Sequence, residues 1–305
     1  MKGRRMKISA NGLDIEIEER GLPDGMPLLL IMGLGMQLVG WPDELVELLV
    51  REGFRVIRFD NCDVGLSQGF DEHGVPNLPW LLLKDWFGLP ITNAPYTIDD
   101  MALDAVGVLD ALGIKRAHIC GASMGGMIAQ TLAAHHPQRV KSLTLMMTSS
   151  GARNLPRPSW KVLRAVTARP PRSQEAAIEQ MVHVFNVIGS TRHRPDPVWL
   201  RRIVEISVRR AWRPAGVARQ IWAIGAHGDR TPLLSRIVAP TMIIHGSDDP
   251  LVRVAAAIDL HRKIAGAEIW IIDGMGHDLP PQLAAEFAQS IIRVAARATA
   301  VSKIA

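Results

Sequence analysis

A serine between two glycines is the first feature of this sequence that could carry out chemistry. Residues 121–125 read GASMG, so Ser123 has one glycine two positions before it and another two positions after it. Small residues at these places let the backbone turn sharply and hold the middle residue in a strained conformation, with its side chain clear of the turn. A serine that merely caps a helix would not need both glycines. The spacing therefore predicts that Ser123 is a nucleophile.

A serine hydroxyl is a weak nucleophile at neutral pH, so it needs a general base and an acid that orients this base. His277 lies on a glycine-flanked loop in GMGHDLP, and Asp248 and Asp249 lie earlier in the chain, in HGSDDP. By residue type, either aspartate could be the acid. His245 is a weaker candidate for the base, because it ends a predicted strand just before the acid loop. The order serine, acid, histidine predicts acyl transfer.

The oxyanion that forms during acyl transfer needs two donors that already point at it. The first predicted donor is the backbone N–H of Met124, which follows the serine at the positive end of a predicted helix. The second is the backbone N–H of Leu34, in the glycine turn IMGLGMQ.

These residues need a scaffold that brings their loops together, and hydrophobic patterning predicts one. Runs typical of β-strands occupy 13–20, 27–32, 55–60, 116–121, 140–149, 240–246 and 267–273, and helical spacing occupies 41–54, 98–114, 124–136, 253–264 and 281–298. Apolar strands separated by helices are typical of an α/β fold, a mostly parallel sheet covered on both faces. The serine, the two aspartates and the histidine each follow one of these strands.

Residues 152–236 interrupt this alternation. They contain 16 Lys and Arg but 5 Asp and Glu, and four of the eight tryptophans. Helical spacing predicts a helical cap over one edge of the sheet, inserted between a first core part at 1–151 and a second at 237–305. Trp199 and Trp212 either form the wall of an apolar substrate pocket or pack inside the cap. We interpret the basic side chains as a solvated helix face.

Composition excludes several classes of protein. The chain has 305 residues, 48% of them hydrophobic, and a net charge of +5, which is typical of a folded globular protein. The glycine turn lacks the third glycine of a dinucleotide-binding loop, and we find no metal-binding or nucleic-acid-binding motif.

Cys62 and Cys120 are expected to be free thiols. No apolar stretch follows the basic N-terminus, so we expect a cytoplasmic protein with no cofactor, no metal and no membrane span.

The motifs GASMG, HGSDDP and GMGHDLP, in this order, resemble the serine esterases of the α/β-hydrolase fold. LLLIMGLGMQLVGWPDEL and FRVIRFDNCDVGLSQ are similar to a bacterial carboxylesterase branch that includes aclacinomycin methylesterase. The resemblance covers about 1–150 and 237–300 and implies an eight-stranded, mostly parallel sheet with an inserted helical cap. It also implies that Asp249 rather than Asp248 is the acid, because the matching loop of the family carries its acid at this place, directly before the proline. Pro250 itself disfavours a helical backbone at Asp249, which suits a side chain that projects toward the histidine loop.

The resemblance implies a cofactor-free hydrolase that cleaves small-molecule carboxylic esters, of short to medium acyl length, through an acyl-enzyme. Two departures from the family are Met32 before Gly33, where His-Gly is usual, and Cys62, where relatives often have arginine. A cofactor-free perhydrolase or a C–C bond hydrolase would use the same three side chains. A hydrolase-like binding protein is the alternative that is not an enzyme.

Overall fold

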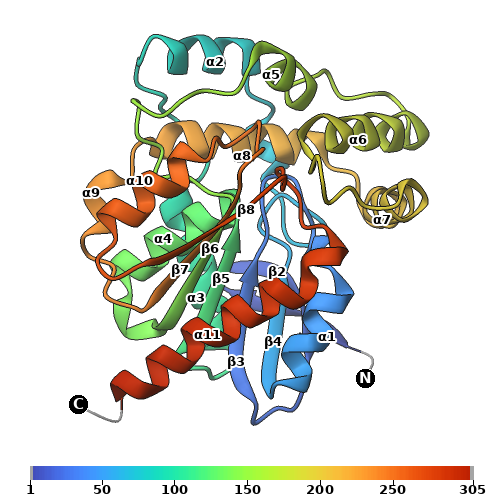
Figure 1. Cartoon of the computed structure of the whole chain (residues 1–305). Coiled ribbons are helices and arrows are strands. Elements are labelled where there is room, and N and C mark those ends of the chain that lie inside the picture. The colour runs from blue at the N-terminus through green and yellow to red at the C-terminus, as the bar shows by residue number, and fades with distance from the viewer. Residues whose placement is uncertain (1–2, 303–305) are drawn as a thin grey trace.

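An eight-stranded sheet forms the centre of the molecule, and helices cover both of its faces (Figure 1). A computed structural model describes residues 3–302 of the chain. The strand order is β1-β2-β4-β3-β5-β6-β7-β8. Strand β2 pairs antiparallel with both β1 and β4, and all neighbours from β4 to β8 pair parallel. The strands are β1 (Arg4–Ala10), β2 (Leu13–Arg20), β3 (Met26–Ile31), β4 (Phe54–Phe59), β5 (Ala117–Ala122), β6 (Val140–Met146), β7 (Thr241–Gly246) and β8 (Glu268–Ile272). The predicted mostly parallel sheet is confirmed.

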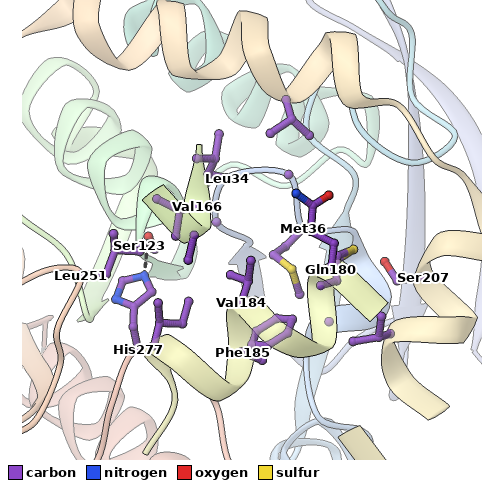
Figure 2. A pocket seen from close by; sticks show the side chains of 18 of the residues that line it. Leu34, Met36, Ser123, Val166, Gln180, Val184, Phe185, Ser207, Leu251 and His277 are labelled. Carbon is purple, nitrogen blue, oxygen red and sulfur yellow. Dashed lines mark hydrogen bonds between the residues drawn. The ribbon is translucent and has the colours of Figure 1, made fainter. Parts of the chain in front are cut away.

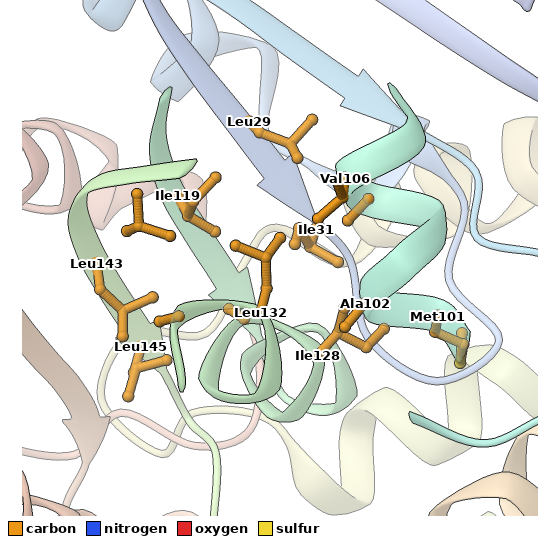
Figure 3. Close-up of a cluster of buried hydrophobic side chains, with 14 of the residues drawn as sticks. Leu29, Ile31, Met101, Ala102, Val106, Ile119, Ile128, Leu132, Leu143 and Leu145 are labelled. Carbon is orange, nitrogen blue, oxygen red and sulfur yellow. The ribbon is translucent and has the colours of Figure 1, made fainter. Parts of the chain in front are cut away.

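The central strands are apolar on both faces because each face packs against helices. Leu29 and Ile31 of β3 lie in one buried cluster with α3 and α4, whereas Leu28 and Leu30 lie in the other with α1 and α11. Figure 3 shows the first cluster, in which strand side chains meet Ile128 and Leu132 of α4. The helices and short 3₁₀ turns of this part are η1 (Leu38–Gly40), α1 (Asp43–Arg51), η2 (Asp71–His73), α3 (Ile98–Ala111), α4 (Met124–His135), η3 (Pro137–Arg139), α9 (Thr231–Leu234), α10 (Ala255–Lys263), η4 (Pro281–Leu283) and α11 (Ala284–Ser302).

Further helices lie over the carboxyl ends of the parallel strands (Figure 1). Four come from the basic segment: α5 (Trp160–Val166), α6 (Gln174–Ile188), α7 (Pro197–Arg210) and α8 (Pro214–His227). A fifth, α2 (Leu78–Trp86), comes from the part that the sequence assigned to the core, and it contacts α8. The boundaries at 152 and 236 stay a prediction. Within residues 3–302, no helix combines the length and apolar character needed to cross a membrane.

Buried ion pairs join the cap helices to the core loop after β4. Arg219 of α8 donates to both carboxylate oxygens of Asp63, at 2.7 and 2.8 Å, and Arg210 of α7 donates to Asp60 at 2.6 Å. Arg219 is only 1% exposed, so the interpretation of the basic residues as a solvated face is wrong for this side chain. Removing one partner of such a pair typically costs about 3–5 kcal/mol of stability. The loop that carries Cys62 is therefore fixed from the cap.

Candidate active site

Ser123 lies on a strained turn between β5 and α4. Its backbone has φ 54° and ψ −118°, a combination that L-residues rarely adopt. The two glycines are required by close backbone approaches: a Cβ on Gly121 would lie 2.2 Å from the carbonyl oxygen of Gly125, and one on Gly125 would lie 2.0 Å from that of Ile31. The turn therefore has the geometry that the GASMG spacing predicts, and it directs the serine hydroxyl away from both elements.

The structure brings Ser123, His277 and Asp249 together from three loops at the carboxyl edge of the sheet. Ser123 Oγ lies 2.9 Å from His277 Nε2, and His277 Nδ1 lies 2.7 Å from Asp249 Oδ2 (Figure 2 shows the serine and the histidine). With the proton on Nδ1, the ring donates to the carboxylate and its Nε2 accepts from the serine hydroxyl. An arrangement of this kind can pass the serine proton to Nε2. The catalytic roles of the three side chains stay a prediction.

Asp249 is held so that one oxygen faces the histidine. Its Oδ1 accepts the backbone N–H groups of Leu251 at 2.9 Å and Val252 at 2.8 Å, which leaves Oδ2 for His277. Burial alone would raise the pKa of Asp249, but the charge of His277 and hydrogen bonds from His245 and His277 outweigh it and hold the pKa well below the usual range. The carboxylate is therefore ionised at neutral pH, which favours a proton on Nδ1 of the histidine.

The two competing side chains lie elsewhere. Asp248 is exposed, and its carboxylate accepts hydrogen bonds from the hydroxyls of Ser247, at 2.9 Å, and Thr191. His245 lies beside the acid rather than beside the serine: its Nε2 is 2.7 Å from the carbonyl oxygen of Val252 and 3.4 Å from Asp249 Oδ2. His245 therefore supports the acid loop.

The histidine loop is also fastened to the cap, which the sequence did not indicate. The backbone N–H of His277 donates to the carbonyl of Ile188, at the end of α6, at 2.7 Å. The hydroxyl of Ser190 donates to Asp278 at 2.6 Å and accepts the backbone N–H of Gly276 at 3.0 Å. The cap thus helps to position the side chain that faces the serine.

Both predicted oxyanion donors lie in segments next to the serine. Met124 is the first residue of α4, where a backbone N–H has no carbonyl partner within the helix. Leu34 follows Gly33, whose Cβ, if it had one, would lie 3.1 Å from the Cβ of Ser123. The loop of Leu34 therefore runs directly along the serine, at the place where a second donor is needed. The assignment of the two N–H groups as oxyanion donors stays a prediction.

Two buried amide side chains hold this loop, and sequence reasoning missed both. Gln220 of α8 accepts the backbone N–H of Gly35 at 2.8 Å and donates to the carbonyl of Cys62 at 2.9 Å. Asn61 donates to the carbonyl of Met32 at 2.9 Å. Asn61 had a weak sequence signal, because it follows β4 in the motif DNCDVGLS. Gln220 had none, since its partners are more than 150 positions away in the chain.

We expect Gln220→Ala to lower kcat for ester hydrolysis by up to about a hundred-fold with little change in KM. Without its hydrogen bond to Gln220, the backbone of Gly35 no longer keeps the neighbouring N–H of Leu34 directed at the oxyanion. Steady-state kinetics measure this split. Gln180→Ala is the matched control, since Gln180 lines the cavity but no hydrogen bond joins it to the oxyanion loop in the described residues. A rise in KM at unchanged kcat would contradict the positioning role of Gln220.

A cavity of about 1370 Å³ opens from Ser123 and His277 into the space between core and cap (Figure 2). Most of its lining is apolar, and Figure 2 shows Leu34, Val166, Val184 and Phe185 around it. Trp199 and Trp212 line the cavity and also pack against the buried cluster of the cap. Their role as a wall for the substrate stays a prediction.

Comparison with known proteins agrees with this fold. The family model described as alpha/beta hydrolase fold matches residues 26–281. Rhodomycin D methylesterase DnrP from Streptomyces peucetius is 30% identical, over 86% of this chain and 88% of its own length. The 2-hydroxymuconate semialdehyde hydrolase of Pseudomonas sp. (strain CF600) is 26% identical, over 93% and 91%.

A solved structure is similar over nearly the whole chain. The enol-lactonase from Burkholderia xenovorans LB400 superposes with a TM-score of 0.73 at 26% identity, covering 95% of this chain and 99% of that one. The family expected from GASMG, HGSDDP and GMGHDLP is thereby confirmed: this chain belongs to the α/β-hydrolase family.

Proposed function

We propose that this chain is a serine hydrolase that cleaves carboxylic esters of small molecules. The observation that carries the proposal is the hydrogen-bonded series from Ser123 through His277 to Asp249, on a strained turn at the end of an apolar cavity. His277 Nε2 takes the serine proton as Oγ attacks the ester carbonyl, and it then gives this proton to the leaving alcohol. Water, activated by the same nitrogen, attacks the acyl-enzyme and releases the acid.

Groups of the chain stabilise both charges that develop in this cycle, the negative oxyanion and the positive imidazolium. The N–H groups of Met124 and Leu34 donate to the oxyanion of each tetrahedral intermediate. Asp249 stabilises the imidazolium that exists while His277 holds the extra proton.

The size of the cavity bears on the substrate. Its volume of about 1370 Å³ exceeds the roughly 300–1,000 Å³ of a common small-molecule site. Short to medium acyl esters fit it, and it also has room for a bulky apolar group on one side of the ester. A methyl ester of a large apolar acid would use this space, as the methylesterase relatives suggest. Arg169 and Arg194 line the cavity but are exposed, so these two positive charges lie near the solvent.

C–C bond hydrolysis is the second candidate, because several relatives carry such names, among them 2-hydroxymuconate semialdehyde hydrolase. It would use the same three side chains. A cofactor-free perhydrolase and a binding protein with little turnover stay as the further alternatives, and the cytoplasmic location stays a prediction.

A substrate panel separates these candidates. We expect hydrolysis of p-nitrophenyl esters from acetate to octanoate and of methyl esters of bulky aromatic acids, and we expect loss of this activity in Ser123→Ala. A ring-cleavage dienoate and a peroxidation assay run beside them. Faster turnover of the dienoate than of every ester would replace the proposal by C–C hydrolysis, and binding without turnover would replace it by a binding protein.

The same panel tests the two cap tryptophans. We expect the double variant Trp199→Ala/Trp212→Ala to lower kcat/KM roughly ten-fold for bulky esters and much less for the acetate, because only large groups reach this wall. Trp222→Ala is the control, since Trp222 is also in the cap but its indole N–H donates to the carbonyl of Thr92. An unchanged order of substrates in the double variant would show that these side chains act in cap packing alone.

A further inference from the structure

Large apolar side chains are exposed on α2, on the residues that follow it and at the start of α5. We call this group the aromatic patch, and it consists of Trp80, Leu83, Trp86, Phe87, Leu89 and Trp160. Trp86 is 60% exposed, Phe87 68% and Trp160 78%. Indole and phenyl rings are costly to leave in water, and a concentration of them on a surface indicates a partner.

The two segments of the aromatic patch are held against one another. Arg157, just before α5, donates to the carboxylate of Asp85 in α2 at 3.1 Å, and its guanidinium lies 5.0 Å from the centre of the Trp86 ring. Arg153 donates to the carbonyl of Gly88 at 3.0 Å. Figure 1 shows α2 and α5 on the side of the cap that faces away from the sheet. The patch is therefore one surface, built from two distant parts of the chain.

The chain segments that carry the aromatic patch are basic. Residues 152–173 contain six Lys and Arg and no acidic residue, and residues 75–95 add Lys84 and the single acid Asp85, which Arg157 neutralises. The exposed basic side chains of the α5 segment are Arg153, Arg157, Lys161, Arg164, Arg169 and Arg172. Tryptophan with lysine and arginine is the composition of surfaces that lie in the headgroup region of a membrane.

The aromatic patch adjoins one of the places where residues that line the cavity are exposed. Val75, Asn77 and Pro79, around the start of α2, line the cavity and are exposed. Residues 168–170, which follow α5, also line it and are exposed. The cavity that begins at Ser123 therefore has exposed lining residues in the segments that carry the patch.

We propose that the aromatic patch binds the surface of an anionic lipid bilayer. The tryptophans and Phe87 enter the interface between headgroups and acyl chains, and the lysines and arginines of the same segments contact the lipid phosphates. Pairing with a second copy of the chain is disfavoured by charge, because a two-fold interface would place each basic surface against an identical one. Bound in this way, the chain would bring the exposed cavity-lining residues beside the patch close to the bilayer.

Co-sedimentation with vesicles tests the proposal. We expect binding to vesicles of phosphatidylcholine with 30% phosphatidylglycerol, little binding to pure phosphatidylcholine, and weaker binding as salt rises. The triple variant Trp86→Ser/Phe87→Ser/Trp160→Ser should bind at least about ten-fold more weakly, as should Lys161→Gln/Arg164→Gln/Arg172→Gln. Leu22→Ser/Val238→Ser, which replaces exposed apolar side chains at the opposite edge of the sheet, should bind like the wild type.

Circular dichroism on each variant checks that it is folded. Binding to both vesicle types alike, or full binding by the folded triple variant, would overturn the proposal. A stable dimer that the triple variant converts to a monomer would also overturn it, and would assign the patch to a second copy of the chain. Ser123→Ala should bind vesicles like the wild type, so loss of the ester chemistry and loss of the membrane surface are distinguishable results.

Discussion

Ser123→Ala is expected to lower kcat for ester hydrolysis by about a million-fold, the loss seen when the nucleophile of a serine hydrolase is removed. The substitution deletes the one oxygen that lies 2.9 Å from His277 Nε2. It leaves the cavity and the predicted oxyanion donors in place, so ester binding should be nearly unchanged. Single-turnover kinetics and equilibrium binding of a non-hydrolysed amide analogue measure the two effects separately.

A fluorophosphonate provides an independent test of Ser123, because it reacts only with an activated hydroxyl. We expect labelling of the wild type at Ser123, found by peptide mass spectrometry, and no labelling of the alanine variant. Ser235→Ala is the control, since Ser235 is an exposed serine between α9 and β7. Labelling at another serine, or substantial hydrolysis by Ser123→Ala, would reject Ser123 as the nucleophile.

The second large effect is expected for Asp249→Asn, which should lower kcat by about ten-thousand-fold. The carboxylate accepts from Nδ1 of His277 at 2.7 Å, and an amide cannot stabilise the imidazolium that forms during attack. Asparagine keeps an oxygen for the backbone N–H groups of Leu251 and Val252, so the loop should stay folded.

Asp248→Asn is the matched control for Asp249→Asn, because it makes the same chemical change one position earlier. Asp248 is exposed and hydrogen-bonds to Ser247 and Thr191, so we expect less than a three-fold change in kcat. Both variants are assayed on one ester, with thermal unfolding as the check on folding. If Asp248→Asn were the damaging change, the acid would have been placed one residue too late.

The main architecture could be predicted because it depends on local patterns. Buried parallel strands read as short apolar runs, and the glycines of GASMG lie where an added Cβ would come within 2.2 Å of a backbone carbonyl oxygen. Two elements escaped this reasoning. Strand β1 (Arg4–Ala10) is a largely exposed edge strand without an apolar run, and α2 (Leu78–Trp86) has no polar face of the usual kind, since its apolar side chains face both the cap and the outside.

For the candidate site, the sequence by itself determined the residue types, their order along the chain and the turn that carries Ser123, and the resemblance with Pro250 already favoured Asp249. Tertiary structure showed the contacts: the carboxylate of Asp249 meets His277, whereas that of Asp248, which has the same chemistry, accepts from Ser247 and Thr191. It also decided that Gln220 and Ser190 of the cap hold the loops of the core, and that the cavity has its present size. Such contacts join residues that are far apart in the chain, and their distances follow from how helices pack on the sheet, which no local spacing encodes.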